Sequence, residues 1–504
     1  MSDTFLINIQ GGASFEILRG ETILSAFIRR GVPLTSPCGG RGICGKCRLT
    51  LIEGIVRLND TGDDVKSGTS FPACRAQALS DITVFLQEEE NSGEPLAVIQ
   101  AGRKIQRAGI ALDIGTTTLQ AELICLDTGE SLETFSAFNN QRSFGADVMS
   151  RISAARNGKL SELSAAINHQ IDELLRQYID KWNIKTIEQC TVSANTTMLH
   201  LFSGVDPSAM GEVPFTPAFL EERHFTGEEL SLPVEHITLL PGISAFVGAD
   251  IVSGLAFIDI MNKKEISFFV DIGTNGEIAV WNNREKHLFC CSTAAGPCFE
   301  GAEISCGMGA VNGAINRISF KEDTGKWFRF GRLFYTTLGN AKAHGVCGAG
   351  FIDAIAVMKK LGAIDETGAL ADEYAAEGFP LAEGIFITQK DVRQFQLAKS
   401  AVYSGIKILC KNAGIEFENI KTAYIAGGLG FFIDMENASQ TGLLPGVLAE
   451  KAAVCGNTSL KGAVKSLTDP SFLPRCREII SHSSTVEIAM DSDFADEFAD
   501  NMWI

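Results

Sequence analysis

The sequence lacks any long hydrophobic run. No apolar stretch reaches the ~18 residues that a membrane-spanning helix needs. The first residues, MSDTFLINIQ, have neither the basic start nor the apolar core of a signal peptide. We therefore expect no membrane partner and a cytoplasmic location. Positive charge is also scarce, since the net charge is −18, which argues against nucleic acid as a partner.

Nothing in this composition points to a disulfide framework, although the chain has 14 cysteines. Thiols in a reducing compartment stay unpaired, so we expect some cysteines to be metal ligands and others to be buried as small hydrophobic residues. With 504 residues, of which 45% are hydrophobic, the chain can form two to four domains with large cores. Residues 487–504 hold six acidic residues and no Lys or Arg, which is typical of a solvated face or a docking surface for a basic partner.

Four cysteines near the start have the spacing of iron–sulfur ligands. Cys38, Cys44 and Cys47 form C-x5-C-x2-C, and Cys74 follows in FPACRAQ. A [2Fe–2S] cluster needs four thiolates that converge on two irons. The glycines of this cysteine loop allow it to wrap closely and to aim N–H groups at the sulfurs; they are Gly39, Gly40, Gly42 and Gly45.

Zinc is the rival metal for these cysteines, but structural zinc sites favour paired C-x2-C knuckles, and the loop has one pair. Residues 4–88 resemble a plant- or adrenodoxin-type [2Fe–2S] ferredoxin domain, which implies an α+β, β-grasp fold. The sequence has no G-x-G-x-x-G after a strand and no flavin signature. We therefore expect a carrier of single electrons. The polar stretch 91–108 is predicted to be a linker.

Two distant stretches share the letters DIGT. Residues 111–123 are ALDIGTTTLQAEL and residues 269–280 are FVDIGTNGEIAV, and each predicts two strands around a tight turn. Turns lined by N–H groups and small polar side chains bind anions. Two facing turns would therefore hold one polyphosphate, whereas a pair of ordinary hairpins is the alternative interpretation. The turn residues are Gly115, Thr116, Thr117 and Thr118 in the first stretch and Gly273, Thr274, Asn275 and Gly276 in the second.

Further residues are predicted to line a cleft around these turns. Asn195 stands at a strand-to-helix junction, and Asp250 precedes another helix. Gly427 and Gly428 follow the predicted strand 423–426, where a glycine turn lets the backbone pass close to a ring or a phosphate. Residues 161–182 have the periodicity of an amphipathic helix, which Ser161 is predicted to cap.

Another group of cysteines raises the question of a second cluster. Cys290, Cys291, Cys298 and Cys306 include no C-x2-C pair, which iron–sulfur runs usually show. We therefore expect them to be structural thiols. His200 lies on the apolar side of a predicted helix, so we expect it to be packed rather than catalytic.

The order of these elements is similar to that of the two-lobed α/β ATPases of the actin/Hsp70/sugar-kinase superfamily. Fused to a ferredoxin domain, it resembles the reductive activators of corrinoid proteins. The matching stretches are ALDIGTTT, SANTTMLHLFSGVDPSAMGEVPF, DIGTNGEIA, TAAGPCFEGAEISCGMGA, VCGAGFIDA, ITQKDVRQFQLAKSA, AYIAGGLG and GNTSLKGA. The expected domains are residues 1–90 (ferredoxin), 91–108 (linker), 109–265 (first ATPase lobe) and 266–504 (second ATPase lobe).

This resemblance implies that the chain hydrolyses ATP with Mg²⁺ and passes one electron from its [2Fe–2S] cluster to cob(II)alamin on a corrinoid protein. The cob(I) state then serves methyl transfer, such as O-demethylation. Asp113 and Asp271 would orient Mg²⁺-bound water and the attacking water, and Glu277 and Glu300 are candidate bases. The electron donor would be a low-potential ferredoxin or flavodoxin. Longer members have a further domain where this chain has its linker, so the oligomeric state stays open between monomer and homodimer.

Other functions remain open from the residues alone. A small-molecule kinase with a redox-sensing ferredoxin domain would need its phosphate acceptor for ATP turnover. A dehydratase activator resembles the cleft but shares a [4Fe–4S] cluster between subunits, which the four-ligand loop disfavours. A non-enzymatic, ATP-gated binding module would have no turnover.

Overall fold

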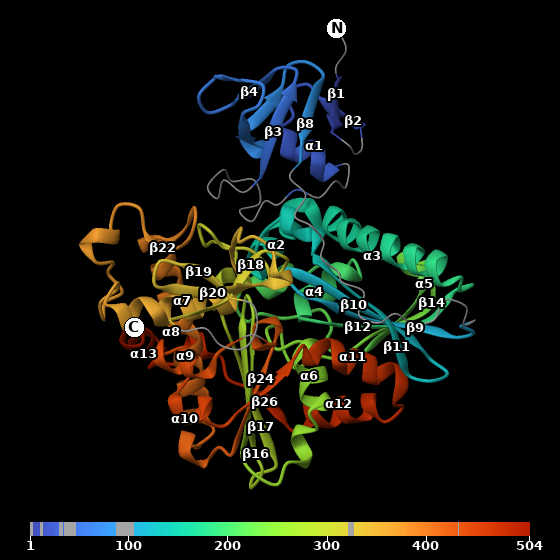
Figure 1. The fold of residues 1–504 in the computed structure, drawn as a ribbon. Coiled ribbons are helices and arrows are strands. Elements are labelled where there is room, and N and C mark those ends of the chain that lie inside the picture. The colour runs from blue at the N-terminus through green and yellow to red at the C-terminus, as the bar shows by residue number, and fades with distance from the viewer. Residues whose placement is uncertain are drawn as a thin grey trace.

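The structure is a computed structural model that describes residues 4–10, 14–29, 34, 47–86, 105–320, 327–431 and 433–504. Cys38, Cys44, the four glycines of the cysteine loop and residues 91–104 of the expected linker lie outside these ranges. No described helix combines the length and the hydrophobicity that crossing a lipid bilayer requires. A small N-terminal domain lies above a larger, two-lobed body (Figure 1).

The N-terminal domain is a mixed sheet that packs on one short helix. Residues with alternating burial form its strands, as in β2, where Phe15 and Ile17 point inward and their neighbours outward. Phe27 of helix α1 (Ile23–Arg29) meets the ring of Phe15 edge to face. The strand order is β2(Ser14–Leu18), β1(Thr4–Ile9), β8(Ile82–Phe85), β3(Arg48–Glu53), β6(Ser70–Pro72), beside a smaller sheet of β5(Asp64–Val65), β4(Val56–Leu58) and β7(Ala76–Ala78). The expected ferredoxin-like fold is confirmed.

The first large sheet contains the first DIGT stretch as a hairpin. Its order is β11(Glu130–Phe138), β10(Thr118–Cys125), β9(Ala108–Ile114), β12(Ile187–Ala194), β14(Val234–Leu239), β13(Arg223–Thr226). Helices α2(Val148–Ala154), α3(Leu160–Trp182) and α4(Thr196–Phe202) follow along the chain, with α5(Gly227–Leu230) after β13. Helix α3 has the expected apolar face. The predicted Ser161 cap is wrong, because the preceding turn runs directly into the helix and no side chain caps it.

The second large sheet contains the second DIGT hairpin. Its order is β25(Ala452–Gly456), β24(Thr422–Ala426), β15(Ser267–Ile272), β16(Gly276–Asn282), β17(His287–Thr293), β26(Ser483–Thr485). Smaller sheets of β19(Phe328–Phe330), β20(Leu333–Thr337), β18(Ala314–Ser319), β21(Gly345–Val346) and of β22(Phe379–Ala382), β23(Ile385–Ile387) extend this lobe. The expected two-lobed actin/Hsp70-like architecture is confirmed.

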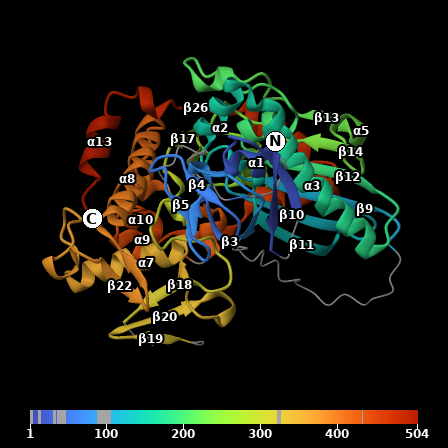
Figure 2. The same cartoon turned by 90° about the horizontal axis from the view of Figure 1, so that it is seen from above.

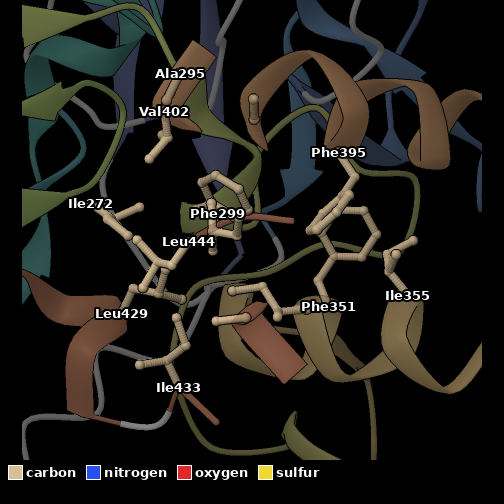
Figure 3. Close-up of a cluster of buried hydrophobic side chains, with 14 of the residues drawn as sticks. Ile272, Ala295, Phe299, Phe351, Ile355, Phe395, Val402, Leu429, Ile433 and Leu444 are labelled. Carbon is tan, nitrogen blue, oxygen red and sulfur yellow. The ribbon is translucent and has the colours of Figure 1, made fainter. Parts of the chain in front are cut away.

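An aromatic cluster supports the segment on which Glu300 lies. The ring of Phe299 packs edge to face on Phe395 of helix α8(Gln389–Asn412), and Phe395 packs in the same way on Phe351 of helix α7(Gly348–Leu361). Ile272 at the end of β15 and Leu429 lie on the other side of Phe299 (Figure 3). The apolar core of the second lobe therefore reaches directly to the end of the second DIGT strand.

Three helices join the two large sheets. After β25, the chain forms α11(Thr458–Thr468) and α12(Phe472–Ser481), which both pack against α6(Ala249–Phe257), and α11 also packs against strands β9 and β12 of the first sheet (Figure 1). Gly254 of α6 and Gly462 of α11 lie where the two helices approach each other closely. The C-terminal part of the chain thus returns to the first lobe.

The remaining helices cover the second lobe. They are α9(Met435–Gln440), α10(Gly446–Ala449) and α13(Phe494–Asp500). Two acidic residues of the C-terminal segment bind α8 of the same chain, because Lys407 pairs with Glu497 and Lys411 with Asp493. Part of the acidic tail therefore has its basic partner inside the molecule.

The N-terminal domain covers the middle of the body when seen from above, between α3 on one side and α7 and α8 on the other (Figure 2). Among the described residues, a hydrogen bond joins the two parts, from the Ser143 hydroxyl to the Leu34 carbonyl at 3.3 Å. Ser143 belongs to the 3₁₀ turn Asn140–Ser143, which immediately precedes α2. The ferredoxin domain thus contacts the lobe that contains the first DIGT hairpin.

We predict that Gly462→Ala destabilises the protein. A Cβ at this position would lie 2.5 Å from the Ser253 carbonyl oxygen of α6, so the helices would have to separate. Overpacking of this kind typically costs about 1–3 kcal/mol. Urea denaturation followed by circular dichroism measures this loss. Lys465→Ala, on the exposed side of the same helix, is the control, and an equal effect of both substitutions would contradict the proposed close packing.

Candidate active site

The first DIGT turn is held by hydrogen bonds to its carbonyl groups. Asn139 donates from its side chain to the Gly115 carbonyl at 2.8 Å and from its backbone to the Thr117 carbonyl at 2.8 Å. Asn195, which caps α4, also donates to the Thr116 hydroxyl at 3.1 Å. The N–H groups of Thr116 and Thr117 donate to no acceptor in the described part of the chain. This arrangement suits an anion.

The second DIGT turn has the same character. The Gly273 N–H donates to the Asn275 carbonyl at 2.9 Å, which closes the turn. The N–H groups of Thr274 and Asn275 have no acceptor among the residues that the structure describes. Gly276 begins β16 and packs against Thr293 and Val402, so it lies behind the turn and not on the cavity wall.

The two turns face each other. The hydroxyls of Thr117 and Thr274 lie 3.2 Å apart, and both donate to one carboxylate oxygen of Glu300. Glu300 belongs to the small-residue stretch after β17. The carboxylate therefore occupies a place between two hydroxyl groups that would equally serve an anionic phosphate oxygen.

A cavity of about 380 Å³ lies between the turns. It brings together every predicted catalytic residue and every predicted turn residue except Gly276. Gly427 and Gly428 close another wall, and Gly348 at the start of α7 lies beside them. Gly427 needs to be glycine, because its φ is +90° and a Cβ would lie 2.4 Å from an Asp271 carboxylate oxygen.

Carboxyl groups dominate the cavity wall. They are Asp113, Asp250, Asp271, Glu277 and Glu300, and no Lys, Arg or His accompanies them among the described lining residues. Loss of solvent is the main cause that raises the pKa of Asp271 to about 8, and the charges of Asp250, Asp113 and Glu300 add to it.

Two neighbouring carboxyl groups respond in the same direction. Loss of solvent and then the charge of Asp113 raise the pKa of Asp250 to about 7. Burial and the charges of Asp250 and Asp271 raise the pKa of Glu277 well above its ordinary value. A site in which several carboxyl groups resist ionisation calls for a cation to balance them.

Residues that the sequence analysis missed hold Asp113. The Asn457 side-chain amide donates to one carboxylate oxygen of Asp113 at 2.6 Å, and the Ser459 hydroxyl donates to the other at 2.8 Å. These bonds oppose the rise that burial causes in the pKa of Asp113. The Ser459 hydroxyl also forms a hydrogen bond of 2.9 Å with the Ser193 hydroxyl, which in turn forms one of 2.8 Å with the Ser253 hydroxyl. Asn457 caps α11 directly after a strand, and this strand-to-helix junction was the signal in the sequence that could have identified it.

The iron–sulfur candidates are only half described. Cys47 is fully buried just before β3, and Cys74 lies in the 3₁₀ turn Ala73–Arg75. Their backbones are neighbours, since the Ala73 N–H donates to the Cys47 carbonyl at 2.7 Å. Two predicted ligands that are far apart in the sequence thus lie in adjacent segments, as a shared cluster requires.

The other predicted cysteines lie elsewhere. Cys290, Cys291 and Cys298 are buried and Cys306 is half-buried, and no cluster of metal-ligating side chains is found among the described residues. His200 is fully buried and stacks on Phe219, which confirms that it is packed.

We predict that Asp271→Asn stabilises the protein more as pH rises. The folded-state pKa of Asp271, about 8, exceeds the ordinary value of about 4, so its contribution to stability is full below pH 4 and falls until pH 8. Asparagine cannot ionise and avoids this loss. The test is the urea midpoint of both chains at pH 5, 7 and 8.5 in EDTA. Glu235→Gln, at an exposed position, is the control, and a pH-independent difference for Asp271→Asn would contradict the raised pKa.

Comparison with known families accounts for most of the chain. Residues 7–79 match the 2Fe-2S iron-sulfur cluster binding domain, residues 108–263 the RACo middle region, and residues 265–504 the C-terminal domain of RACo, the ASKHA domain.

Similar proteins share this organisation. The chain is 32% identical over 424 residues to the corrinoid activation enzyme RamQ of Eubacterium limosum, and the match covers 78% of this chain and 70% of the relative. It is 29% identical over 402 residues to the [Co(II) methylated amine-specific corrinoid protein] reductase of Methanosarcina barkeri, with 74% and 72% covered. A solved structure of a reductive activator for a corrinoid, iron-sulfur protein superposes with a TM-score of 0.72 at 26% identity, over 99% of this chain and 98% of that one. The chain therefore belongs to the RACo family of corrinoid-activating enzymes, which unite a [2Fe–2S] ferredoxin domain with an ASKHA domain.

Proposed function

We propose that this protein uses ATP to drive the one-electron reduction of cob(II)alamin to cob(I)alamin on a partner corrinoid protein. The relatives named above are a corrinoid activation enzyme and a reductase of a Co(II) corrinoid protein. The observation that carries the proposal is the pair of facing DIGT turns, with a ring of carboxyl groups, in one chain with a ferredoxin domain. Neither part alone accounts for an uphill electron transfer.

The ferredoxin domain provides the route for the electron. Cys38, Cys44, Cys47 and Cys74 would hold the cluster, and the adjacent placement of Cys47 and Cys74 supports this ligand set. When bound, the cluster supplies one-electron transfer at a low potential. A low-potential ferredoxin or flavodoxin would supply the electron, and the cob(I) product would serve methyl transfer, such as O-demethylation. Described cysteines form no disulfide, which supports a reducing, cytoplasmic location.

The cleft between the lobes would bind the nucleotide. The free N–H groups of Thr116, Thr117, Thr274 and Asn275 would meet phosphate oxygens, and Gly427 and Gly428 would face the adenosine. Five carboxyl groups line this cleft and would repel an anionic polyphosphate unless a cation bound with it. This lining supports a requirement for Mg²⁺. Asp113 and Asp271 would orient the water molecules of the ion and the attacking water.

Two carboxyl groups are candidates for the catalytic base. Glu277 on β16 is buried in the cleft wall, and burial together with its carboxylate neighbours raises its pKa, which makes it a stronger proton acceptor than an ordinary carboxylate. Glu300 already accepts hydrogen bonds from Thr117 and Thr274, so it would have to release both hydroxyls when phosphate enters. This exchange would link occupation of the cleft to the separation of its two walls.

The coupling to ATP follows from the redox energetics. For one electron, every ~59 mV of unfavourable potential gap lowers the equilibrium constant tenfold. A plant-type cluster at about −400 mV that faces an acceptor of much lower potential would therefore yield little cob(I) without coupling to ATP.

We predict that Asp271→Asn lowers corrinoid-stimulated ATP turnover and cob(I) formation together, by about 100-fold or more, because the variant lacks the carboxylate that would orient the reacting groups once Mg²⁺ and ATP are bound. Phosphate release and cobalt absorbance, measured in the same anaerobic sample, test this. Glu235→Gln should leave both rates unchanged. An unchanged turnover in Asp271→Asn would remove Asp271 from the site.

We also predict that Cys47→Ala abolishes the visible absorption of the cluster and cobalt reduction but leaves Mg–ATP affinity unchanged, because the cysteine lies outside the cleft. Absorption spectra and calorimetric titration of the same preparation test both parts. Cys455→Ala, which alters a thiol outside the ferredoxin domain, should keep the absorption. Loss of ATP affinity in Cys47→Ala would show that the two domains do not bind their ligands independently.

A further inference from the structure

Arg151 is a fully buried cation behind the first DIGT turn. It lies on α2, and its guanidinium donates to the carbonyls of Thr116 and Gly145 and to the side-chain oxygen of Gln141. A further contact of 3.1 Å joins it to the Met198 sulfur. No carboxylate accepts a hydrogen bond from it in the described part of the chain. Burial lowers the pKa of Arg151 to about 9, so the side chain keeps its charge at neutral pH.

The bond to the Thr116 carbonyl acts on the peptide that presents an N–H group to the cleft. That carbonyl and the Thr117 N–H belong to one planar, trans peptide, so they point in opposite directions. With Arg151 on the carbonyl side, the N–H is aimed away from the guanidinium and has no acceptor among the described residues. A charged donor on the carbonyl oxygen polarises the peptide and makes its N–H a stronger donor.

The other carbonyls of the turn have neutral partners. Asn139 binds Gly115 and Thr117, and the Gly115 N–H donates to the Thr118 carbonyl at 2.9 Å. Four hydrogen bonds are thus donated to the carbonyl oxygens of this turn, and Arg151 is the charged donor among them. The cavity wall itself has no described Lys or Arg, so the charge of Arg151 would act on a bound anion through this peptide.

We propose that Arg151 is a positioning residue for phosphate recognition, which fixes and polarises the Thr116–Thr117 peptide so that the Thr117 N–H binds a phosphate oxygen. The inference rests on the proposed function, because it requires that the cleft binds a nucleotide. It adds that recognition of the polyphosphate depends on a cation that never touches the ligand. Affinity for the nucleoside part should not depend on Arg151.

The test is calorimetric titration of the full-length protein, with its cluster and Mg²⁺, by ATP, ADP and adenosine. In Arg151→Met the charge is lost at similar volume, and ATP and ADP affinity should fall by about 10-fold, because the Thr117 N–H loses the orientation and polarisation that strengthen its hydrogen bond to phosphate. Arg151→Lys should fall between this variant and the wild type, since lysine keeps the charge but loses the planar fork. Adenosine affinity should stay unchanged in both.

Arg156→Met is the matched control. This arginine lies on the next turn, is exposed and pairs with Glu212, so its loss should change no affinity. Equal weakening of ATP and adenosine in Arg151→Lys would overturn the inference and indicate a general structural role. Arg151→Lys also decides the matter if Arg151→Met does not fold. If the wild type bound ATP no better than adenosine, the proposed nucleotide site itself would be refuted, and this inference with it.

Discussion

The desolvation of four carboxyl groups in one cleft, those of Asp113, Asp250, Asp271 and Glu277, is the constraint on which the rest of this structure depends. Loss of solvent is the main reason that Asp250, Asp271 and Glu277 resist ionisation, and the charges of neighbouring carboxyl groups in the same cleft add to it. A cation bound to an anionic ligand relieves this cost, and the two DIGT turns present free N–H groups to such a ligand. The desolvated carboxyl groups thus lower the stability of the empty protein and favour the binding of a cation together with an anionic ligand.

The contacts around the cleft join the two lobes. Asp113 of the first sheet is held by Asn457 and Ser459, which directly follow a strand of the second sheet. Glu300 of the second lobe accepts from Thr117 of the first. The 3₁₀ turn before α2 then contacts the ferredoxin domain through Ser143. Occupation of the cleft therefore has a short physical path to the domain that transfers the electron.

Features that are contiguous in the sequence were predictable, whereas those made by packing were not. The DIGT hairpins, the glycine turn at Gly427 and the ferredoxin-like fold each have a local pattern, and the structure has them where predicted. The contact of Asn457 with Asp113 and that of Arg151 with the Thr116 carbonyl arise only when α11 and α2 pack behind the first turn, because the local sequence does not identify these partners. Ser161 shows that a local pattern can also mislead. It was predicted to cap the helix, but the preceding turn continues directly into the helix and no side chain caps it.

The most direct measurement of the central claim is the ratio of cob(I) to cob(II) on a partner corrinoid protein at a fixed solution potential. A redox-buffered, anaerobic cell sets the donor potential, and the cobalt absorbance is followed before and after ATP is added with Mg²⁺. The account predicts that without ATP the ratio obeys the buffer potential, and that with ATP it rises above this limit until the nucleotide is consumed. A ratio that is equal with and without ATP would contradict the account.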